Sequence, residues 1–179
     1  MNLYTYSGQI SYPTGAPSIL DIAVSLSREG RYAGAGVHWW PVALHTFVVC
    51  DLLPPELKLH GLLHDASECI TGDVPKPAKT PQIESMENEI LTRIYASLKL
   101  PVPTRLGDLN VHEADRRALH GEVWTVGTLS LRSLYSMDWE AEALVWAYFK
   151  CYKPMDCLDA EGSCVKEFLR RFELYKTWL

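Results

Sequence analysis

The stretch at residues 62–79, LLHDASECITGDVPKPAK, places a histidine and two carboxylates beside apolar residues. His64 and Glu68 are four positions apart, so in a helix both project from one face. Asp65 lies roughly 100° further round that helix, and Glu68 is within reach of both. Imidazole and carboxylate together are typical ligands of divalent metals. Because exposed or capped polar pairs are also common, these residues alone leave a metal site and a surface pair both open.

Two further residues of the same kind are expected inside the protein. His45 lies among apolar residues of a predicted helix, where an imidazole needs partners for its nitrogens, and a core histidine bonded to backbone is the commoner case. Asp115 lies on another predicted helix beside Val111 and Ala118, and a buried carboxylate must be paired or coordinated. Ligands from three separate helices are how metal sites in helical bundles are built.

An almost entirely helical chain is predicted to position these residues. Helical periodicity, caps and proline or glycine boundaries predict helices over residues 18–30, 41–53, 55–72, 80–100, 109–124, 138–152 and 164–179. Ser18 with Asp21 forms a capping box at the first, and Thr80 caps the fourth. A small hairpin is predicted around Ser7 and Gly8. With no repeat or linker, we expect one all-α domain over residues 1–179.

Composition fits a globular domain, with 179 residues, 47% apolar and 22% charged. The net charge of −5 does not suggest a nucleic-acid or membrane partner, so an anionic ligand would need a local basic pocket. No run approaches membrane-spanning length and the first 15 residues do not form a signal peptide, so we expect a cytoplasmic protein. None of the five cysteines belongs to a CxxC pair, and free thiols are expected.

In combination, these motifs resemble a known family. His45, His64-Asp65 and Asp115 are similar to the H…HD…D ligand set of the HD-domain phosphohydrolases. HDASECITGDVPKPAK resembles a segment of the small bacterial 5'-deoxynucleotidases and phage deoxynucleotide phosphohydrolases, and SLSREGRYAGAG…WWPVALHT resembles the upstream region of the phage members. The similarity covers residues 20–122 and implies the HD-domain helical bundle. The C-terminal third carries no matching motif.

The resemblance implies a role for each matching residue. His45, His64, Asp65 and Asp115 would bind one divalent metal ion, with Zn, Co, Mn and Mg all open. Glu68 would be the catalytic glutamate that handles the attacking water, although an exposed helix glutamate is the plain alternative. Asp73 would lie near the water and the sugar, or is a turn residue after Gly72.

Substrate contacts are implied for a second group. Arg31 and Lys79 match the cations that contact phosphate, and Pro77 stiffens the loop presenting Lys79. Trp40 would line a base pocket, although core packing is the more frequent role of tryptophan. Tyr32 stands where many members have tryptophan, which leaves sugar and base selectivity open.

Some neighbouring polar residues are expected to play no direct part. Lys76 is as readily explained as a solvated side chain. His60 is read as a structural histidine that supports the site. His112 and His120 are read as surface or supporting groups.

The resemblance implies a metal-dependent enzyme that hydrolyses deoxynucleotides. The phage-like layout favours a dATP triphosphohydrolase, which releases deoxyadenosine and triphosphate, over a 5'-deoxynucleotidase that removes phosphate from dNMPs. A non-catalytic HD module that binds a nucleotide, or a metal-free helical interaction protein, are the alternatives of other classes. The resemblance also implies a phage-encoded protein of the host cytoplasm and, because relatives are usually homo-oligomers, a homo-oligomer for which the apolar helix at residues 164–179 could serve as the interface.

Overall fold

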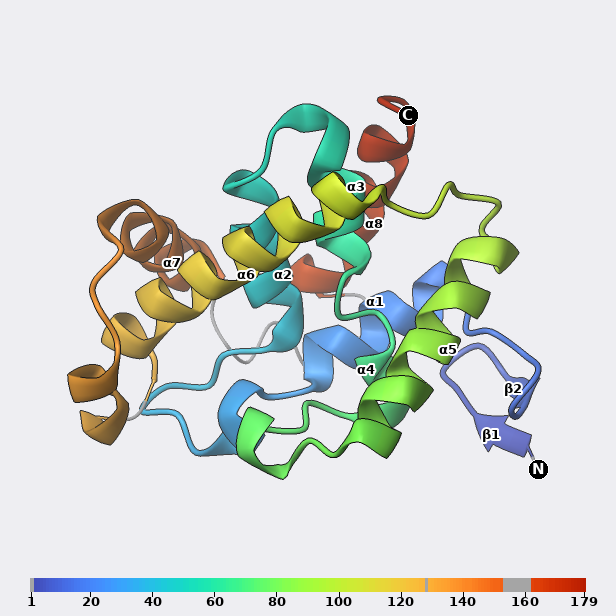
Figure 1. Ribbon diagram of the computed structural model, residues 1–179, viewed down its shortest axis with the longest axis horizontal. Helices are drawn as coiled ribbons and strands as arrows, with labels where there is room; N and C mark the ends of the chain where they lie inside the picture. Colours follow the sequence, from blue (N-terminus) through green and yellow to red (C-terminus); the bar gives the residue numbers. More distant parts are fainter. Residues whose placement is uncertain (1, 128, 153–161) are drawn as a thin grey trace.

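The computed structural model describes residues 2–127, 129–152 and 162–179. As predicted, the described chain is mostly helical (Figure 1). The α-helices are α1 (Ile19–Arg28), α2 (Val42–Asp51), α3 (Lys58–Leu63), α4 (Glu68–Thr71), α5 (Pro81–Ser97), α6 (Arg105–Thr125), α7 (Trp139–Cys151) and α8 (Ser163–Lys176). Short 3-10 turns occupy Arg31–Gly34 (η1), Pro55–Leu57 (η2), Lys76–Ala78 (η3) and Leu129–Leu134 (η4). Strands β1 (Asn2–Tyr4) and β2 (Gln9–Ser11) pair antiparallel and confirm the hairpin.

Helix α2 is the centre of the bundle. Every residue from Val42 to Cys50 is buried, and the helix contacts α1, α3, α6, α7 and α8. A helix that is apolar all round is stable only when other elements cover all its faces. His45 therefore lies in the interior, with no exposed surface.

The predicted helix over residues 55–72 is not continuous, which corrects the first expectation for the motif. The chain forms η2 and α3, turns through residues 64–67, and resumes as α4. The His64 ring donates a hydrogen bond from Nδ1 to the carbonyl oxygen of Gly61 at 2.7 Å. In a continuous helix the backbone amide of residue 65 would bond that carbonyl, so the side chain competes with it. Through the turn, backbone hydrogen bonds link residues three positions apart in place of the helical four. The Glu68 amide, for example, donates to the Asp65 carbonyl oxygen at 3.0 Å. His64 and Glu68 therefore lie on successive short helical segments.

Helices α6 and α7 pack closely because of one glycine. A Cβ atom at Gly121 would lie 2.6 Å from the backbone of Ala141, so any larger residue there would force the helices apart. Asp138 caps α7 by accepting a hydrogen bond from the amide of Ala141 at 3.1 Å. Arg117 of α6 also bonds Asp138, through Nε at 2.7 Å. The start of α7 is thus fixed to the middle of α6.

Helix α8 is attached to α2 by a buried arginine. Arg171 reaches Asp51 at 3.0 Å and lies over the ring of Phe47, 4.8 Å from its centroid. Val165, Phe168 and Phe172 of α8 are buried in the same core. The apolar face of α8 that the sequence singled out is therefore covered within the chain, whereas Leu174, Trp178 and Leu179 nearer the end of residues 164–179 are exposed.

The cysteines differ in part from expectation. Cys50, Cys69 and Cys151 are free thiols, as predicted. Cys164 at the start of α8 is disulfide-bonded, so the prediction of five free thiols is wrong. Cys157 lies outside the described residues.

Over the part of the chain that the structure describes, none of the helices combines the length and the apolar character that crossing a membrane requires.

Asp21 fastens the hairpin to α1. Its carboxylate accepts from the Ser7 amide at 2.7 Å and the Ser7 hydroxyl at 2.8 Å, and it completes the predicted capping box with Ser18. Burial alone would raise its pKa, but these hydrogen bonds together lower the pKa of Asp21 to about 2.

We expect this carboxylate to stabilise the fold by about 2 kcal/mol, because its pKa is lower in the folded than in the unfolded chain. The contribution is complete above pH 4 or so and is lost as the pH falls towards about 2. Urea unfolding of the Asp21→Asn variant between pH 2 and 7 should lack this pH-dependent component. The exposed Asp108→Asn is the matched control, and equal pH dependence in Asp21→Asn and wild type would contradict the assignment.

Candidate metal centre

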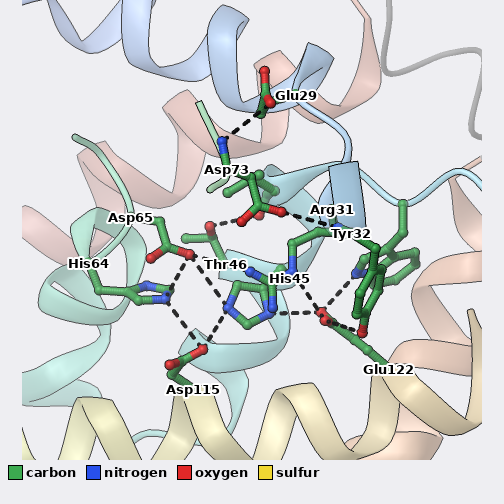
Figure 2. Close-up of polar contacts among 12 residues, drawn as sticks. Glu29, Arg31, Tyr32, His45, Thr46, His64, Asp65, Asp73, Asp115 and Glu122 are labelled. Atoms are coloured by element: carbon green, nitrogen blue, oxygen red, sulfur yellow. Dashed lines mark hydrogen bonds and ion pairs between the residues drawn. The ribbon is translucent and has the colours of Figure 1, made fainter. Parts of the chain in front are cut away.

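Two imidazoles and two carboxylates from three helical segments meet at one point (Figure 2). His45 Nε2 lies 3.0 Å from Asp115 Oδ1 and 3.6 Å from Asp65 Oδ2. His64 Nε2 lies 3.0 Å from Asp65 Oδ2 and 4.0 Å from Asp115 Oδ1. One ligand atom each of His45, His64 and Asp115 lies within 4.8 Å of the other two, so these three residues could hold a metal ion. Asp65 adds a fourth oxygen at the same point.

The hydrogen bonds behind the two rings fit metal binding. His64 Nδ1 contacts the carbonyl of Gly61, which can only accept, so Nδ1 carries the proton. His45 Nδ1 lies 2.8 Å from a carboxylate oxygen of Glu122, which likewise favours a proton on Nδ1. Both Nε2 atoms are buried and, among the described residues, lack an aligned hydrogen bond. Ring nitrogens oriented by a carbonyl or carboxylate on the far side are typical of metal-binding histidines.

Glu122 is the carboxylate behind His45, and the sequence did not identify it. Its side chain has no exposed surface. In addition to its contact with His45, its carboxylate accepts hydrogen bonds from Trp40 Nε1 at 2.8 Å, Arg31 Nε at 3.3 Å and the Tyr32 hydroxyl at 3.4 Å. Although burial opposes its ionisation, the charges of His45 and Arg31 hold the pKa of Glu122 below its usual range.

His45 lies between carboxylates on both sides of its ring. Burial and Arg31 oppose a charge on the ring, but Glu122 and Asp115 on its two sides raise the pKa of His45 to about 10. The two carboxylates on either side of the ring therefore favour its charged form. A metal ion must displace a ring proton, because only the neutral imidazole can bind it.

The segment between α1 and α2 brings Arg31 and Tyr32 to this network. The bridge between Gly30 and Pro41 closes the segment at its base. Tyr32 has φ 60° and ψ 29°, a left-handed conformation that costs a non-glycine residue about 1–2 kcal/mol. It is kept there by its amide, which donates to Asp73 Oδ2 at 3.2 Å, and by its hydroxyl on Glu122.

A cleft of about 440 Å³ opens beside the centre. His64, Asp65, Glu68 and Asp115 line it, together with Lys76 and Lys79. Glu68 is 6% exposed, and its Oε2 has no hydrogen-bond partner in the described structure. Burial and the nearby charges of Asp65 and Asp73 raise the pKa of Glu68 to about 10.

Lys79 is held at the cleft wall by a residue of α5. Its Nζ donates to Glu87 Oε2 at 2.8 Å, while Glu87 Oε1 accepts from Thr71 Oγ1 at 3.5 Å. Although partial burial opposes the charge, the bond to Glu87 raises the pKa of Lys79. The structure thus brings Glu68 and Lys79 into the same cleft as the candidate ligands.

Three residues expected to contact a substrate are placed differently. Trp40 is 1% exposed and supports Glu122 from the interior, because its indole N–H needs a partner there. Pro77 is exposed within η3 and does not line the cleft. Arg31 is engaged by carboxylates, with Glu122 at 3.3 Å and Asp65 at 4.0 Å.

Three other histidines were expected to be structural, supporting or surface groups, and two of them, His60 and His112, line the cleft. His60 is buried and its Nδ1 lies 3.0 Å from the hydroxyl of Tyr95. His112 is exposed beside Asp108, at 3.6 Å. His120 contacts the Ser136 hydroxyl through Nδ1 at 3.2 Å.

The sequence did hold a signal for Glu122. It follows Asp115 by seven positions, so both lie on nearly the same side of α6, together with Ala118. A second carboxylate on a face predicted to be buried requires partners of its own. Glu87 gave no such signal, because its contact with Lys79 depends on how α5 lies against the loop before it.

Comparison with known proteins places the chain near one curated relative. No protein-family profile matches it. A protein of Escherichia coli (strain K12), described as uncharacterized protein YfdR, is 37% identical over 117 residues. The aligned part is 60% of this chain and 66% of the relative, slightly less than two thirds of its length. The description of this relative states no activity, so any functional conclusion depends on the site itself.

We expect Glu122→Gln to weaken metal binding about 10- to 100-fold, because the amide cannot supply the charge that orients His45 and balances Arg31. Isothermal titration of the purified protein with Mn²⁺ and with Zn²⁺ would measure it. The control is Glu113→Gln on the exposed side of the same helix, where Glu113 pairs with Arg116. If both variants bind metal as tightly as wild type, with unchanged circular dichroism, Glu122 does not position the site.

Proposed function

We propose that this protein is a metal-dependent phosphohydrolase that acts on deoxynucleotides. The observation that carries the proposal is the meeting of His45, His64, Asp65 and Asp115 beside a cleft that is also lined by Glu68 and Lys79. The four residues are those that resemble the HD-domain ligand set. Asp65 as a fourth ligand and the choice among Mn, Co, Zn and Mg belong to the proposal.

The charge of the cleft supports a role for a cation. Its lining contains the carboxylates of Asp65, Glu68, Glu84, Glu87, Asp108 and Asp115, but only the two lysines Lys76 and Lys79. A phosphate ester would meet a predominantly negative surface. A divalent metal at the centre would offset part of that charge and supply the Lewis acidity that phosphoryl transfer to water needs.

Glu68 is the residue best placed to handle the water. It follows the ligand pair in the chain, lines the same cleft and carries a buried oxygen without a hydrogen-bond partner among the described residues. In the loaded site the positive charge of the metal would favour the ionised form of Glu68, whose free oxygen would then accept a proton from the attacking water. A glutamate with a merely structural role would be expected to have both oxygens paired.

Lys79 is proposed to hold the phosphate. A lysine whose ammonium is steadied by Glu87 presents its remaining donors to the cleft without losing its charge. Asp73 is proposed to act near the sugar end, since its carboxylate bonds the amide of Tyr32, next to Arg31. The substrate-binding role of Arg31 is proposed as indirect, through its pairing with Asp65 and Glu122.

The preferred reaction is hydrolysis of dATP to deoxyadenosine and triphosphate. This preference comes from the resemblance of the segments around Arg31 and His45 to phage members. Incubating the protein with Mn²⁺, Co²⁺, Zn²⁺ or Mg²⁺ and each dNTP or dNMP, followed by ion-exchange chromatography, tests it directly. Triphosphate from dATP is the expected product; phosphate from dNMPs alone would overturn the preference, and no turnover with any metal would overturn the enzyme assignment.

For Glu68→Gln we expect turnover to fall at least about 100-fold, because the amide cannot take a proton from water. Bound metal, measured by mass spectrometry of the purified variant, should stay at the wild-type level. Glu84→Gln, on the exposed rim of the same cleft, is the matched control. Wild-type turnover in Glu68→Gln would show that another group handles the water.

A further inference from the structure

Helix α7 carries an exposed apolar stripe that the proposed function does not use. Trp139 is 75% exposed and Trp146 is 44% exposed, whereas Ala141 and Val145 on the opposite side are fully buried against the bundle. Figure 1 shows α7 at the edge of the molecule, beside α6. A hollow lined by Ala143, Trp146, Ala147, Lys150 and Cys151 follows this outer side. Exposed tryptophans grouped on one surface are a common mark of protein interfaces.

The spacing of the stripe is that of a helix–helix contact. Trp139, Ala143, Trp146 and Lys150 succeed one another at intervals of four, three and four residues. This pattern keeps residues on one line along a helix and is the spacing of residues that interlock with a second helix. At the centre of the stripe the small Ala143 is followed by the large Trp146. The helix surface there therefore has a recess at Ala143 next to the projecting indole of Trp146.

The charges on α7 favour an antiparallel partner of the same sequence. Glu140 and Glu142 lie in the first turn, and Lys150 lies in the last. Within the described ranges, neither Glu142 nor Lys150 forms an ion pair. Two parallel copies would place like charges together, whereas antiparallel copies place each Lys150 beside the acidic first turn of the other.

We propose that α7 forms the interface of a homodimer, in which the α7 helices of two copies pack antiparallel about a two-fold axis between residues 144 and 145. In this register Trp146 of each copy packs on Ala143 of the other, large against small. Lys150 lies over the ring of the partner's Trp139 and next to the partner's Glu142. The same patch serves both copies, as a two-fold interface requires.

This proposal is independent of the enzymatic one. The candidate ligands are on α2, on α6 and in the turn after α3, and none of the stripe residues lines their cleft. The interface is also small, since a helix of 13 residues is only about 20 Å long. We therefore expect a dimer that dissociates at micromolar concentrations, about 1–100 µM.

Sedimentation velocity of the full chain over about 1–300 µM tests the proposal, because that range brackets the expected dissociation constant. Ala143→Arg should raise this constant at least about 10-fold by filling the recess with a charge. Lys150→Glu should weaken the dimer by a similar factor. The double variant Lys150→Glu, Glu142→Lys should restore the dissociation constant to within about threefold of wild type, because the attraction between the two residues is rebuilt with its charges exchanged. Leu106→Arg, at an exposed apolar residue on α6, is the control and should leave the dimer intact.

Three outcomes would overturn the proposal. A wild-type protein that stays monomeric throughout this range excludes the dimer. A dimer that Ala143→Arg and Lys150→Glu leave unchanged, while circular dichroism shows each variant folded, places the interface elsewhere. Weakening by Lys150→Glu without recovery in the double variant excludes the antiparallel register.

Discussion

The buried carboxylate of Glu122 is the constraint on which the rest of the site depends. A carboxylate without exposed surface is stable only when donors replace the water it has lost, and here Arg31, Tyr32, Trp40 and His45 supply them. These donors come from η1, from the end of the loop and from α2, whereas Glu122 comes from α6. One charge therefore fixes the positions of three parts of the chain relative to one another.

That arrangement has a direct consequence for His45. With Nδ1 directed to Glu122, its Nε2 faces Asp65 and Asp115. The helix that carries His45 cannot rotate, because α2 is buried on all sides. The candidate metal centre is thus preorganised by packing on one side and by a hydrogen bond to a carboxylate on the other.

The opposite wall of the cleft is built from shorter-range contacts. His64 interrupts the helix after α3 by bonding Gly61, and the turn that results leads directly into Glu68. Gly72 then ends α4 with φ 74°, a conformation that suits glycine, and starts the loop towards Lys79. Glu87 holds Lys79 on that wall. A rigid centre and a wall of short helical turns and loops together form the cleft, which is the arrangement the proposed hydrolysis requires.

The sequence by itself predicted most of the helices and, through the resemblance, the four candidate ligands, of which the structure groups His45, His64 and Asp115. Caps such as Ser18 with Asp21 and Thr80 act through neighbouring residues, so local pattern was enough to place the helix starts. The tertiary structure alone decided the role of Glu122, the interior position of Trp40 and the pairing of Arg31. Each of these depends on contacts between residues 77 to 91 positions apart, and a local pattern does not encode which distant donor reaches a buried charge. The break after α3 was missed for a related reason, because a side chain replaced a backbone partner where helical propensity alone predicted continuity.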